Sequence, residues 1–544
     1  MNVIEIFQES ARRHASNAAI VSGRAGREST TTFANLDRRS RQIAALLLKE
    51  GLQPGDAVVV LVPMCAELYA IMAALLRLGM VPVFVEPGSW RETLDRAMSA
   101  LPVRAVIAVP VACAARVLIP ALRRIPKVFV AGTFFPGAVS LRSARTLAPC
   151  EHLEAAAADR PAILTFTSGS TGRPKGVPRS HGVLAATHAI LSAHLGLVPG
   201  DLDVAMLPFV VFTNLGAGVG SLIPDGDLTR PGAIDASGLA NQIQAWSPAG
   251  IVASPALLER LADDALARGA RFDSLRRVFA GGAPVFPRVL DKLAQLAPAA
   301  RVHAIYGATE AEPMAVLERT EFGAEERDAM HRAKGLLVGW PIPEVQLRIL
   351  RGRFGEPRGP WTPSELDAAT AAAGEAGEIV VSGTHVVESY LDAEDDRQLK
   401  IRVGAEVWHR TGDAGLLDGA GRLWLLGPCK ARVEDERGCR YPLVVDAALS
   451  DHPALSRATL VHHRGRVLLV VQPRGDPAHD DLISIGRSLT SVGVDELVVI
   501  RRLPLDRRHN AKIDHPRLRR MLDERRWELR VPISRSEAPT TRAG

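Results

Sequence analysis

Between residues 163 and 176 the chain carries residue types that can hold a row of phosphates. Residues 163–166 are apolar or β-favouring and predict a buried strand. Hydroxyl and glycine residues follow at once: Thr167, Ser168, Gly169, Ser170, Thr171 and Gly172. Glycines let several backbone N–H groups face one anion, and Lys175 adds a positive charge at the same place. We therefore predict a loop that closes over the phosphates of a nucleoside triphosphate.

The alternative interpretation of this stretch is an ordinary solvated loop, since glycine, serine and threonine are common in loops. The preceding strand and the lysine favour phosphate binding instead. The stretch is not a Walker A loop, because residues 172–176 read Gly-Arg-Pro-Lys-Gly and lack the Gly-Lys-Ser/Thr order.

A second group of reactive residues follows a predicted strand at residues 302–305. The chain turns at Gly307 and then presents a hydroxyl and a carboxylate. In a parallel α/β fold such a turn lies at the carboxyl ends of the strands, where ligands bind. Tyr306 is suited to lie against a base, Thr309 to reach a phosphate, and Glu310 to hold Mg²⁺, which favours carboxylates combined with phosphate oxygens. The alternative is a buried strand with an ordinary turn.

Three weaker patterns lie elsewhere in the chain. Gly281, Gly282 and Ala283 follow an apolar run, and their small size lets a planar ring approach the backbone. Asp413 ends a Thr-Gly-Asp turn. Lys512 precedes an apolar residue near the C-terminus, where a lone lysine is most often a surface residue. Taken singly, each pattern is an ordinary turn or surface feature.

Together and in this order, the motifs resemble those of the AMP-forming adenylating enzymes, which include acyl-CoA synthetases, luciferases and peptide-synthetase adenylation domains. The stretch around Lys175 resembles their signature phosphate loop, and residues 306–310 match their aromatic-Gly-x-Thr-Glu motif residue by residue. The motifs spread from about residue 160 to residue 513, so the resemblance covers nearly the whole chain.

The resemblance implies a role for each of these residues. The residues implied to hold the phosphates of ATP are Thr167, Ser168, Gly169, Ser170, Thr171, Gly172, Lys175 and Thr309. The residues implied to frame the adenine are Gly281, Gly282, Ala283, Tyr306 and Gly307. By the same resemblance, Glu310 holds Mg²⁺, Asp413 accepts the ribose hydroxyls, and Lys512 bridges the carboxylate and the α-phosphate. A cation at that place stabilises the charge that spreads over the α-phosphate in the transition state.

Alternating apolar runs and helical patterns are expected to position these residues. The runs that predict strands lie at residues 57–62, 81–85, 105–109, 128–130, 251–253, 277–280 and 302–305. Helical spacing of apolar residues predicts helices at residues 36–50 and 66–78. Such alternation predicts an α/β fold of mostly parallel sheets with helices on both faces.

The resemblance implies two domains. The large N-terminal adenylation domain would span residues 1–427, with a β-rich subdomain at about 335–427. A small, mobile α+β domain that carries Lys512 would span residues 428–530 and rotate about a hinge near Lys430. Residues 531–544 are expected to be a disordered tail.

Two departures from the family pattern bear on the second half of the reaction. The chain has Gly427-Pro428 where the family often has Gly-Arg, and proline fixes φ and removes a donor. It also lacks the Phe-His pair that many acyl- and aryl-CoA synthetases carry, because residues 207–214 read Leu-Pro-Phe-Val-Val-Phe-Thr-Asn. The apolar replacement of that histidine, together with residues 83–88, 306–313 and 508–513, resembles the β-lactone synthetases of olefin pathways, an enzyme type in which a changed hinge would be tolerable.

Composition excludes several other classes of protein. The 544 residues are 47% hydrophobic and 23% charged, as in globular proteins, and the net charge of +6 is not gathered into a block that would bind nucleic acid. Five scattered cysteines form no C-x-x-C pair. The chain shows neither a basic signal peptide nor an uninterrupted apolar span of about 20 residues. We therefore expect a cytoplasmic enzyme; a homodimer or a complex with a pathway partner stays open.

The sequence thus predicts an ATP- and Mg²⁺-dependent enzyme that converts a carboxylic acid, either a fatty or a β-hydroxy fatty acid, to acyl-AMP. The second step is then intramolecular closure of a β-lactone. One alternative is thioester formation with CoA or a carrier protein, and another is a catalytically silent nucleotide-binding protein. The acid is expected in an apolar pocket near residues 209–216 and 306–314.

Overall fold

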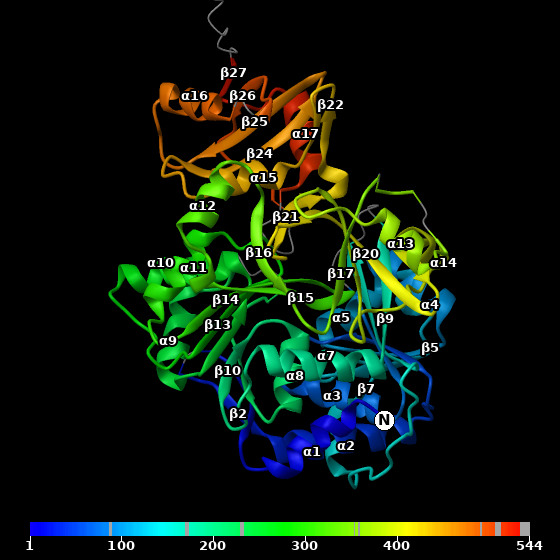
Figure 1. Cartoon of the computed structure of the whole chain (residues 1–544). Coiled ribbons are helices and arrows are strands. Elements are labelled where there is room, and N and C mark those ends of the chain that lie inside the picture. The colour runs from blue at the N-terminus through cyan, green and yellow to red at the C-terminus, as the bar shows by residue number, and fades with distance from the viewer. Residues whose placement is uncertain are drawn as a thin grey trace, which may run out of the picture.

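Two large sheets and a smaller C-terminal sheet organise the chain (Figure 1). The computed structural model describes residues 1–24, 26–85, 90–168, 173–228, 233–352, 354–356, 359–489, 492–505 and 513–533. All structural statements below concern these residues.

The first large sheet has seven strands in the order β7-β6-β5-β3-β4-β8-β9. Its strands are β3 (Ala57–Leu61), β4 (Val81–Phe84), β5 (Val103–Ala108), β6 (Lys127–Val130), β7 (Val139–Ser140), β8 (Pro161–Ser168) and β9 (Pro174–Ser180). All neighbours are parallel except β8 and β9, which form an antiparallel pair. The sheet therefore ends in an antiparallel pair of strands, and these two strands flank the phosphate-loop motif in the sequence.

The second large sheet combines a parallel half and an antiparallel half, in the order β17-β18-β20-β21-β16-β15-β14-β13-β12-β10-β11-β1-β2, with β19 paired to β20. The parallel half and its edge are formed by β1 (Ala18–Ser22), β2 (Ser29–Thr32), β10 (Leu202–Ala205), β11 (Gly220–Ile223), β12 (Gly250–Ala253), β13 (Arg277–Gly281) and β14 (Arg301–Ala308). The antiparallel half consists of β15 (Ala311–Glu318), β16 (Leu336–Pro341), β17 (Gln346–Leu350), β18 (Gly377–Ser382), β19 (Lys400–Val403), β20 (Glu406–Leu417) and β21 (Leu423–Pro428). The chain changes from parallel to antiparallel pairing at the β14–β15 hairpin, which carries the second motif.

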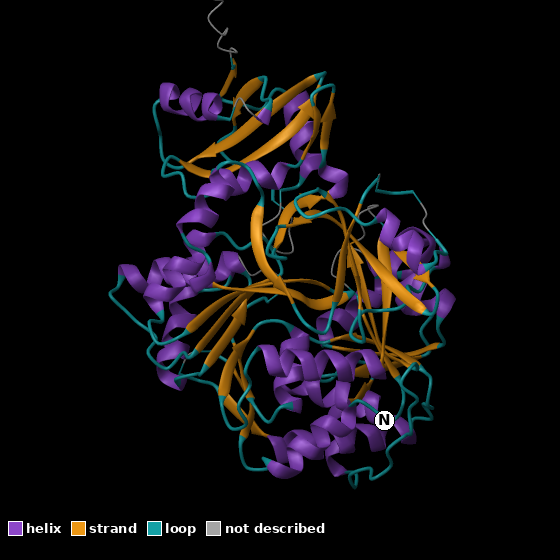
Figure 2. Cartoon of the chain, in the orientation of Figure 1, coloured by secondary structure: helices purple, strands orange, loops and turns teal. Residues whose placement is uncertain are grey.

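Helices cover and join these sheets (Figure 2). Those of the N-terminal part are α1 (Ile4–Arg13), α2 (Phe33–Lys49), α3 (Ala66–Arg77), α4 (Trp90–Ala100), α5 (Pro110–Ala114), α6 (Pro120–Arg123), α7 (His181–His194), α8 (Pro208–Gly216), α9 (Ala236–Trp246), α10 (Pro255–Ala267), α11 (Pro287–Leu296), α12 (Ala324–His331), α13 (Pro363–Ala369) and α14 (Ala393–Leu399). Nearly every residue of α3 is buried, as expected for a helix between two sheets. One hydrophobic cluster runs from Val60 on the first sheet through Ile71 on α3 to Phe279 on the second. The two large sheets therefore share a core, and the predicted α/β fold class is confirmed.

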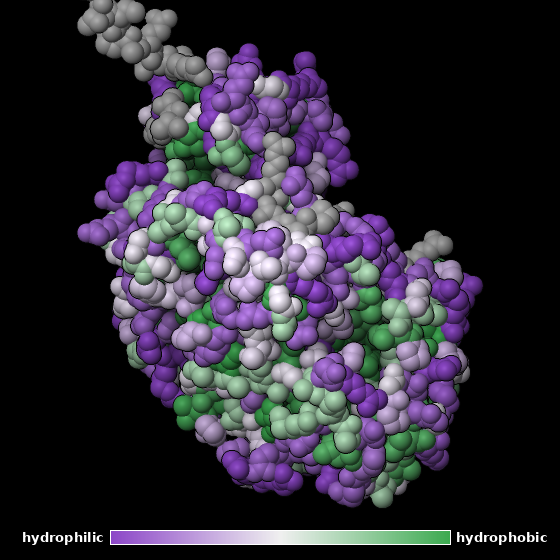
Figure 3. Space-filling model, turned by 45° about the vertical axis from the view of Figure 1, so that its right-hand side comes forward, coloured by the Kyte–Doolittle hydropathy of each residue, from purple (hydrophilic) through white to green (hydrophobic). Residues whose placement is uncertain are grey.

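The C-terminal part is built on a four-stranded sheet in the order β24-β25-β26-β27. Its elements are β22 (Val433–Asp435), β23 (Gly438–Arg440), α15 (Pro442–Ala448), β24 (Leu455–His463), β25 (Arg466–Pro473), α16 (His479–Ser488), β26 (Glu496–Val499), α17 (His515–Asp523) and β27 (Leu529–Pro532). It stands at one end of the larger body (Figure 1). On the face shown in Figure 3 it is mostly hydrophilic, whereas hydrophobic residues gather on the larger part.

The last strand corrects one expectation. The tail was expected to start at residue 531, but Val531 pairs with Leu497 and Ile533 is only 4% exposed. Pro532 makes the strand hard to recognise in the sequence. Proline is nevertheless tolerated on an edge strand, because its missing N–H leaves no ladder bond unmade there. The part of the predicted tail that lies beyond residue 533 falls outside the described residues.

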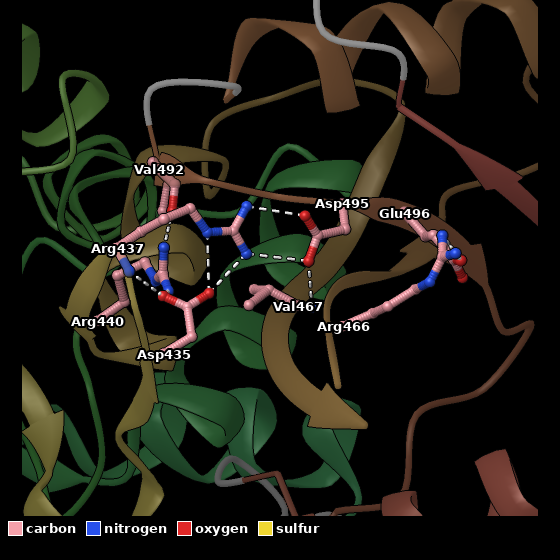
Figure 4. Close-up of polar contacts among 8 residues, drawn as sticks. All are labelled: Asp435, Arg437, Arg440, Arg466, Val467, Val492, Asp495 and Glu496. Atoms are coloured by element: carbon pink, nitrogen blue, oxygen red, sulfur yellow. Dashed lines mark hydrogen bonds and ion pairs between the residues drawn. The ribbon is translucent and has the colours of Figure 1, made fainter. Parts of the chain in front are cut away.

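Arg437 joins the β22–β23 hairpin to the small sheet (Figure 4). Its Nη2 donates to Oδ2 of Asp435 in the hairpin at 2.6 Å, and its Nη1 donates to Oδ1 of Asp495 beside β26 at 2.8 Å. Asp495 also accepts the backbone N–H of Val467 on β25 at 2.7 Å. Because these contacts tie the hairpin to the small sheet, a rotation of that sheet would carry the hairpin with it. A hinge near Lys430, just before the hairpin, is compatible with this arrangement.

Candidate active site

The two flanks of the phosphate-loop motif are the paired strands β8 and β9. Gly169, Ser170, Thr171 and Gly172 fall outside the described residues, but both flanks of the loop are defined. Thr167 stands opposite Lys175 in the antiparallel register, and Ser168 stands opposite Pro174. The hairpin therefore holds Lys175 directly beside the hydroxyl-rich end of β8.

Lys175 is 3% exposed, and both carboxylates and the ammonium group of Lys430 act on its charge. Burial lowers the pKa of its ammonium group, while the carboxylates of Asp395 and Glu310 act in the opposite direction. A buried cation that is held charged by nearby carboxylates is available to an incoming polyphosphate anion.

Glu310 lies in the turn between β14 and β15 and is 9% exposed. Its Oε1 accepts a hydrogen bond of 2.7 Å from the hydroxyl of Tyr390, and its backbone carbonyl accepts the N–H of Val387 at 2.8 Å. The carboxylate is thereby fixed in direction. The structure thus brings Glu310 and Lys175, which come from separate motifs, to the same place.

Tyr390 is the centre of a cluster that sequence reasoning missed. Nζ of Lys400 lies 5.2 Å from the centroid of its ring, and Nζ of Lys175 lies 5.8 Å from it. Lys400 donates to the backbone carbonyl of Val387. Burial lowers the pKa of Lys400 to about 8, although Glu310 opposes that shift. No local signal marks Tyr390, because its partner carboxylate is 80 residues away in the chain.

Tyr306 and Asp413 are also brought together. The hydroxyl of Tyr306 on β14 donates to Oδ2 of Asp413 on β20 at 3.0 Å. Burial raises the pKa of Tyr306 well above its ordinary value, and the Asp413 carboxylate adds to that shift. The phenol therefore stays protonated and able to donate. The backbone N–H of Asp413 donates to Oγ1 of Thr411 at 3.1 Å, which fixes the turn of the third motif.

The glycine pair at the end of β13 fits a close approach to its neighbour. Gly281 stands beside Ile305 in the parallel register, and a Cβ on Gly281 would lie 3.3 Å from the carbonyl oxygen of Ile305. Gly282 has φ of +83°, a conformation that residues with side chains rarely adopt. Gly281, Gly282 and Ala283 thus form a turn without bulky side chains at the carboxyl end of β13, next to the strand that carries Tyr306.

Arg179 and Glu312 form a second feature that the sequence did not reveal. Nη2 of Arg179 on β9 donates to the backbone carbonyl of Thr309 at 2.7 Å, which links the phosphate hairpin to the β14–β15 turn. Burial raises the pKa of Glu312 to about 7, against the influence of the Arg179 guanidinium. A Cβ on Gly307 would lie 3.2 Å from Cγ of Glu312, so the glycine leaves room for that side chain.

The two stretches that were predicted to enclose the acid pack on two different hydrophobic clusters. Phe209 and Phe212 of α8 pack on one cluster, and Tyr306 and Ala308 of β14 pack on the other, while all four remain partly accessible. Glu312 falls within the second of these stretches, so the wall is not entirely apolar as expected from the sequence.

Lys512 lies in residues 506–512, outside the described residues. Leu505 and Ile513, on the two sides of that segment, form an antiparallel bridge. The role implied for Lys512 therefore stays a prediction.

The chemistry of the described residues suits a cation held by one carboxylate and by a bound phosphate. Within the described ranges, no group of three histidine, cysteine, aspartate or glutamate side chains could hold a metal ion. Mg²⁺ typically takes one or two carboxylates together with substrate phosphates and water, and Glu310 beside Lys175 fits that pattern. Among the described helices, none is at once apolar and long enough to cross a membrane.

Comparison with known proteins identifies a matching family and relatives of this chain. The model of the family described as "AMP-binding enzyme" matches residues 7–391. The chain is 33% identical over 520 residues to an olefin beta-lactone synthetase of Xanthomonas campestris pv. campestris, covering 91% of each chain. It is 32% identical over 518 residues to an olefin beta-lactone synthetase of Stenotrophomonas maltophilia, covering 91% of this chain and 92% of the other.

Solved structures share the fold at lower identity. The amide bond synthetase McbA from Marinactinospora thermotolerans superposes with a TM-score of 0.76 at 21% identity, over 95% of this chain and 99% of that one. O-succinylbenzoate coenzyme A synthetase from Bacillus subtilis, solved in complex with ATP and magnesium ion, superposes with a TM-score of 0.74 at 21% identity, over 94% and 98% of the two chains. Because the superpositions cover 94% and 95% of the chain, they include its C-terminal part, and the chain shares the fold of these two synthetases.

Proposed function

This chain belongs to the family of AMP-binding enzymes, and from that premise we propose that it activates a β-hydroxy fatty acid with ATP and closes the product to a β-lactone. The adenylation part of the proposal rests on one observation. Residues from three separate motifs are paired or adjacent in the structure: Lys175 from the first, Tyr306 and Glu310 from the second, and Asp413 from the third. The lactone part is supported by identity of about one third to two olefin beta-lactone synthetases.

The site residues would divide the nucleotide between them. Lys175 and the hydroxyl-rich end of β8 are suited to the phosphates, and Glu310 would hold Mg²⁺ against them. Gly281, Gly282 and Ala283, with Tyr306 and Gly307, would frame the adenine, and Asp413 would accept the ribose hydroxyls. Mg²⁺, when bound, neutralises phosphate charge and orients the triphosphate. Thr309 and Lys512 complete the set of residues that we propose for phosphate contact.

In the first step a carboxylate oxygen of the acid attacks the α-phosphorus of ATP. The new bond joins oxygen to phosphorus, and the bond to the β-phosphate bridge breaks, which releases pyrophosphate. Negative charge spreads over the α-phosphate oxygens in the transition state. Lys512 would stabilise that charge, and Lys175 would stabilise the charge of the leaving pyrophosphate.

In the second step the β-hydroxyl oxygen attacks the acyl carbon of the acyl-AMP. A carbon–oxygen bond closes the four-membered ring, the bond from the acyl carbon to the phosphate oxygen breaks, and AMP leaves. The hydroxyl proton passes to solvent. The net change in the acid is the loss of one water, because one carboxylate oxygen leaves with AMP.

A second candidate is thioester formation with CoA. It is favoured by 25% identity over 328 residues, 58% of this chain, to 2-succinylbenzoate–CoA ligase of Arabidopsis thaliana. Attack by the substrate's own hydroxyl needs no path for pantetheine. A hinge restricted by Pro428, which stands opposite Asp413 at the end of β21, would therefore be tolerated if the product is a lactone.

Product analysis separates the candidates. The purified protein is incubated with ATP, Mg²⁺ and pairs of 3-hydroxy and unsubstituted fatty acids of equal length, with and without CoA. AMP release and products are followed by chromatography and mass spectrometry. We expect AMP and a product that equals the acid less one water, from 3-hydroxy acids and without CoA. A product that forms only with CoA and has the mass of a thioester would establish the ligase instead, and no AMP with any acid would contradict adenylation.

A further inference from the structure

Tyr390 contacts both a carboxylate and a cation of the proposed phosphate site. Its hydroxyl donates to Oε1 of Glu310 at 2.7 Å, and Nζ of Lys175 lies over the face of its ring, 5.8 Å from the centroid. A second cation over the ring, Lys400, is already engaged, since it donates to the backbone carbonyl of Val387. The ammonium group of Lys175, by contrast, forms no hydrogen bond and no ion pair with any residue that the structure describes. A buried cation without such a partner is unfavourable unless a ligand supplies one.

Backbone hydrogen bonds hold Tyr390 in this place independently of its hydroxyl. The N–H of Val387 donates to the carbonyl oxygen of Glu310 at 2.8 Å, and the N–H of Leu391 donates to the carbonyl oxygen of Gly176 at 2.8 Å. A Cβ on Gly176 would lie 2.8 Å from Cβ of Leu391, so glycine is needed for this close approach. The chain around Tyr390 is thus fixed on one side to the β14–β15 turn and on the other to β9. The ring would therefore keep its place without the hydroxyl.

The hydroxyl of Tyr390 determines which partner Glu310 takes. Glu310 is close enough to Lys175 to act on its charge, yet the two form no ion pair in the described structure. If the carboxylate turned toward Lys175, the buried hydroxyl would lose its acceptor, which is unfavourable. Asp395, the other carboxylate that acts on Lys175, has its Oδ2 3.8 Å from Nη1 of Arg96. Both carboxylates that could neutralise the lysine are therefore directed to other groups.

We propose that Tyr390 is a positioning residue: by holding the carboxylate of Glu310, it prevents an ion pair between Glu310 and Lys175 and leaves the lysine free for the phosphates of ATP. This inference rests on the proposed function and deepens it. An internal ion pair would have to break each time a nucleotide binds, and the free energy of breaking it would be lost from the affinity. The hydrogen bond from Tyr390 removes that competition, and it does so whether or not a metal ion is bound.

Nucleotide binding in the absence of metal tests this role. Dissociation constants for ATP are measured by isothermal titration calorimetry in EDTA for the wild type, Tyr390→Phe, Glu310→Gln and the double variant. Tyr390→Phe frees Glu310 to pair with Lys175, so the affinity for ATP should fall about 10-fold or more, as expected for loss of a hydrogen bond to a charged group. In the double variant this carboxylate is gone, so the affinity should lie within about 3-fold of that of Glu310→Gln.

Tyr69→Phe is the matched control, since Tyr69 is also buried and its hydroxyl donates to the backbone carbonyl of Pro208 at 3.3 Å. It should leave the affinity for ATP unchanged, and the melting temperature of Tyr390→Phe should stay close to that of the wild type because backbone bonds hold the segment. An equal loss from Tyr390→Phe in the wild-type and Glu310→Gln backgrounds, or no loss in either, would overturn the inference alone. A wild type that binds no ATP, with or without Mg²⁺, would overturn the proposed function and the inference with it.

Discussion

The hydroxyl of Tyr306 donates a hydrogen bond of 3.0 Å to the carboxylate of Asp413, although 107 residues separate the two. The bond crosses from β14, where the sheet is still parallel, to β20 in its antiparallel half. It connects the residue proposed to lie against adenine with the residue proposed to hold the ribose. This hydrogen bond therefore fixes the proposed adenine contact and the proposed ribose contact relative to each other.

Tyr306→Phe should weaken ATP binding more than it slows chemistry. The substitution keeps the ring against the base but removes the donor that orients Asp413. A hydrogen bond to a charged group contributes about 1.5–3 kcal/mol, so we expect KM for ATP to rise about 10- to 150-fold, with kcat reduced less than about 3-fold. Pyrophosphate exchange at varied ATP concentration measures both constants. An unchanged KM together with a large fall in kcat would show that Tyr306 acts on the reacting groups instead.

Because of Lys400, the free energy of unfolding should depend on pH in the alkaline range. Burial lowers its folded-state pKa from 10.5 to about 8, so between these values the unfolded chain binds more protons at this position than the folded chain. The free energy of unfolding then rises with pH through that window. The gain from this group is up to about 3 kcal/mol by the pKa difference.

Lys400→Met removes this dependence. Melting temperatures of wild type and variant are compared from pH 7 to pH 10, and the difference between them should shift in favour of the wild type as pH rises. The exposed Lys49, replaced in the same way, should give a difference that does not change with pH. A constant difference for Lys400→Met as well would mean that its pKa is not lowered in the folded state.

The sequence predicted the elements of this fold better than it predicted the contacts among them. Strands such as β3 and β12 are short apolar runs, a signal that is complete within a few residues. Motif residues could be predicted because each motif is also local. Tyr390 and Arg179 were missed because each acts on a residue far away in the chain: Tyr390 donates to Glu310 and Arg179 to Thr309, over 80 and 130 residues. Only the fold brings such partners together.

Gly427→Ala should destabilise the junction between the large sheet and the C-terminal part. Gly427 has φ of +121°, and a Cβ there would lie 3.0 Å from Cβ of Leu443 at the start of α15. The variant therefore combines backbone strain with overpacking, each worth about 1–3 kcal/mol. Gly438→Ala is the matched control, because Gly438 has φ of +110° and a Cβ there would have no atom within 4 Å. We expect the melting temperature to fall in both variants and to fall further for Gly427→Ala; equal falls would assign the whole effect to backbone strain.

Lys512→Ala should separate the two half-reactions. In the proposed mechanism Lys512 stabilises charge on the α-phosphate while acyl-AMP forms, and the rotation implied for the small domain would move Lys512 away from the phosphate of the leaving AMP before the hydroxyl attacks the acyl carbon. Loss of one such electrostatic contact lowers adenylation by about 100- to 1,000-fold. Acyl-AMP supplied from outside should still be converted to lactone and AMP, within about 5-fold of the wild-type rate. Pyrophosphate exchange measures the first step and single-turnover product analysis the second, with Lys49→Ala as a control for loss of a lysine elsewhere. If Lys512→Ala slows both steps alike, the residue serves ring closure as well as adenylation. Lys512 would then lie beside the reacting atoms in both steps.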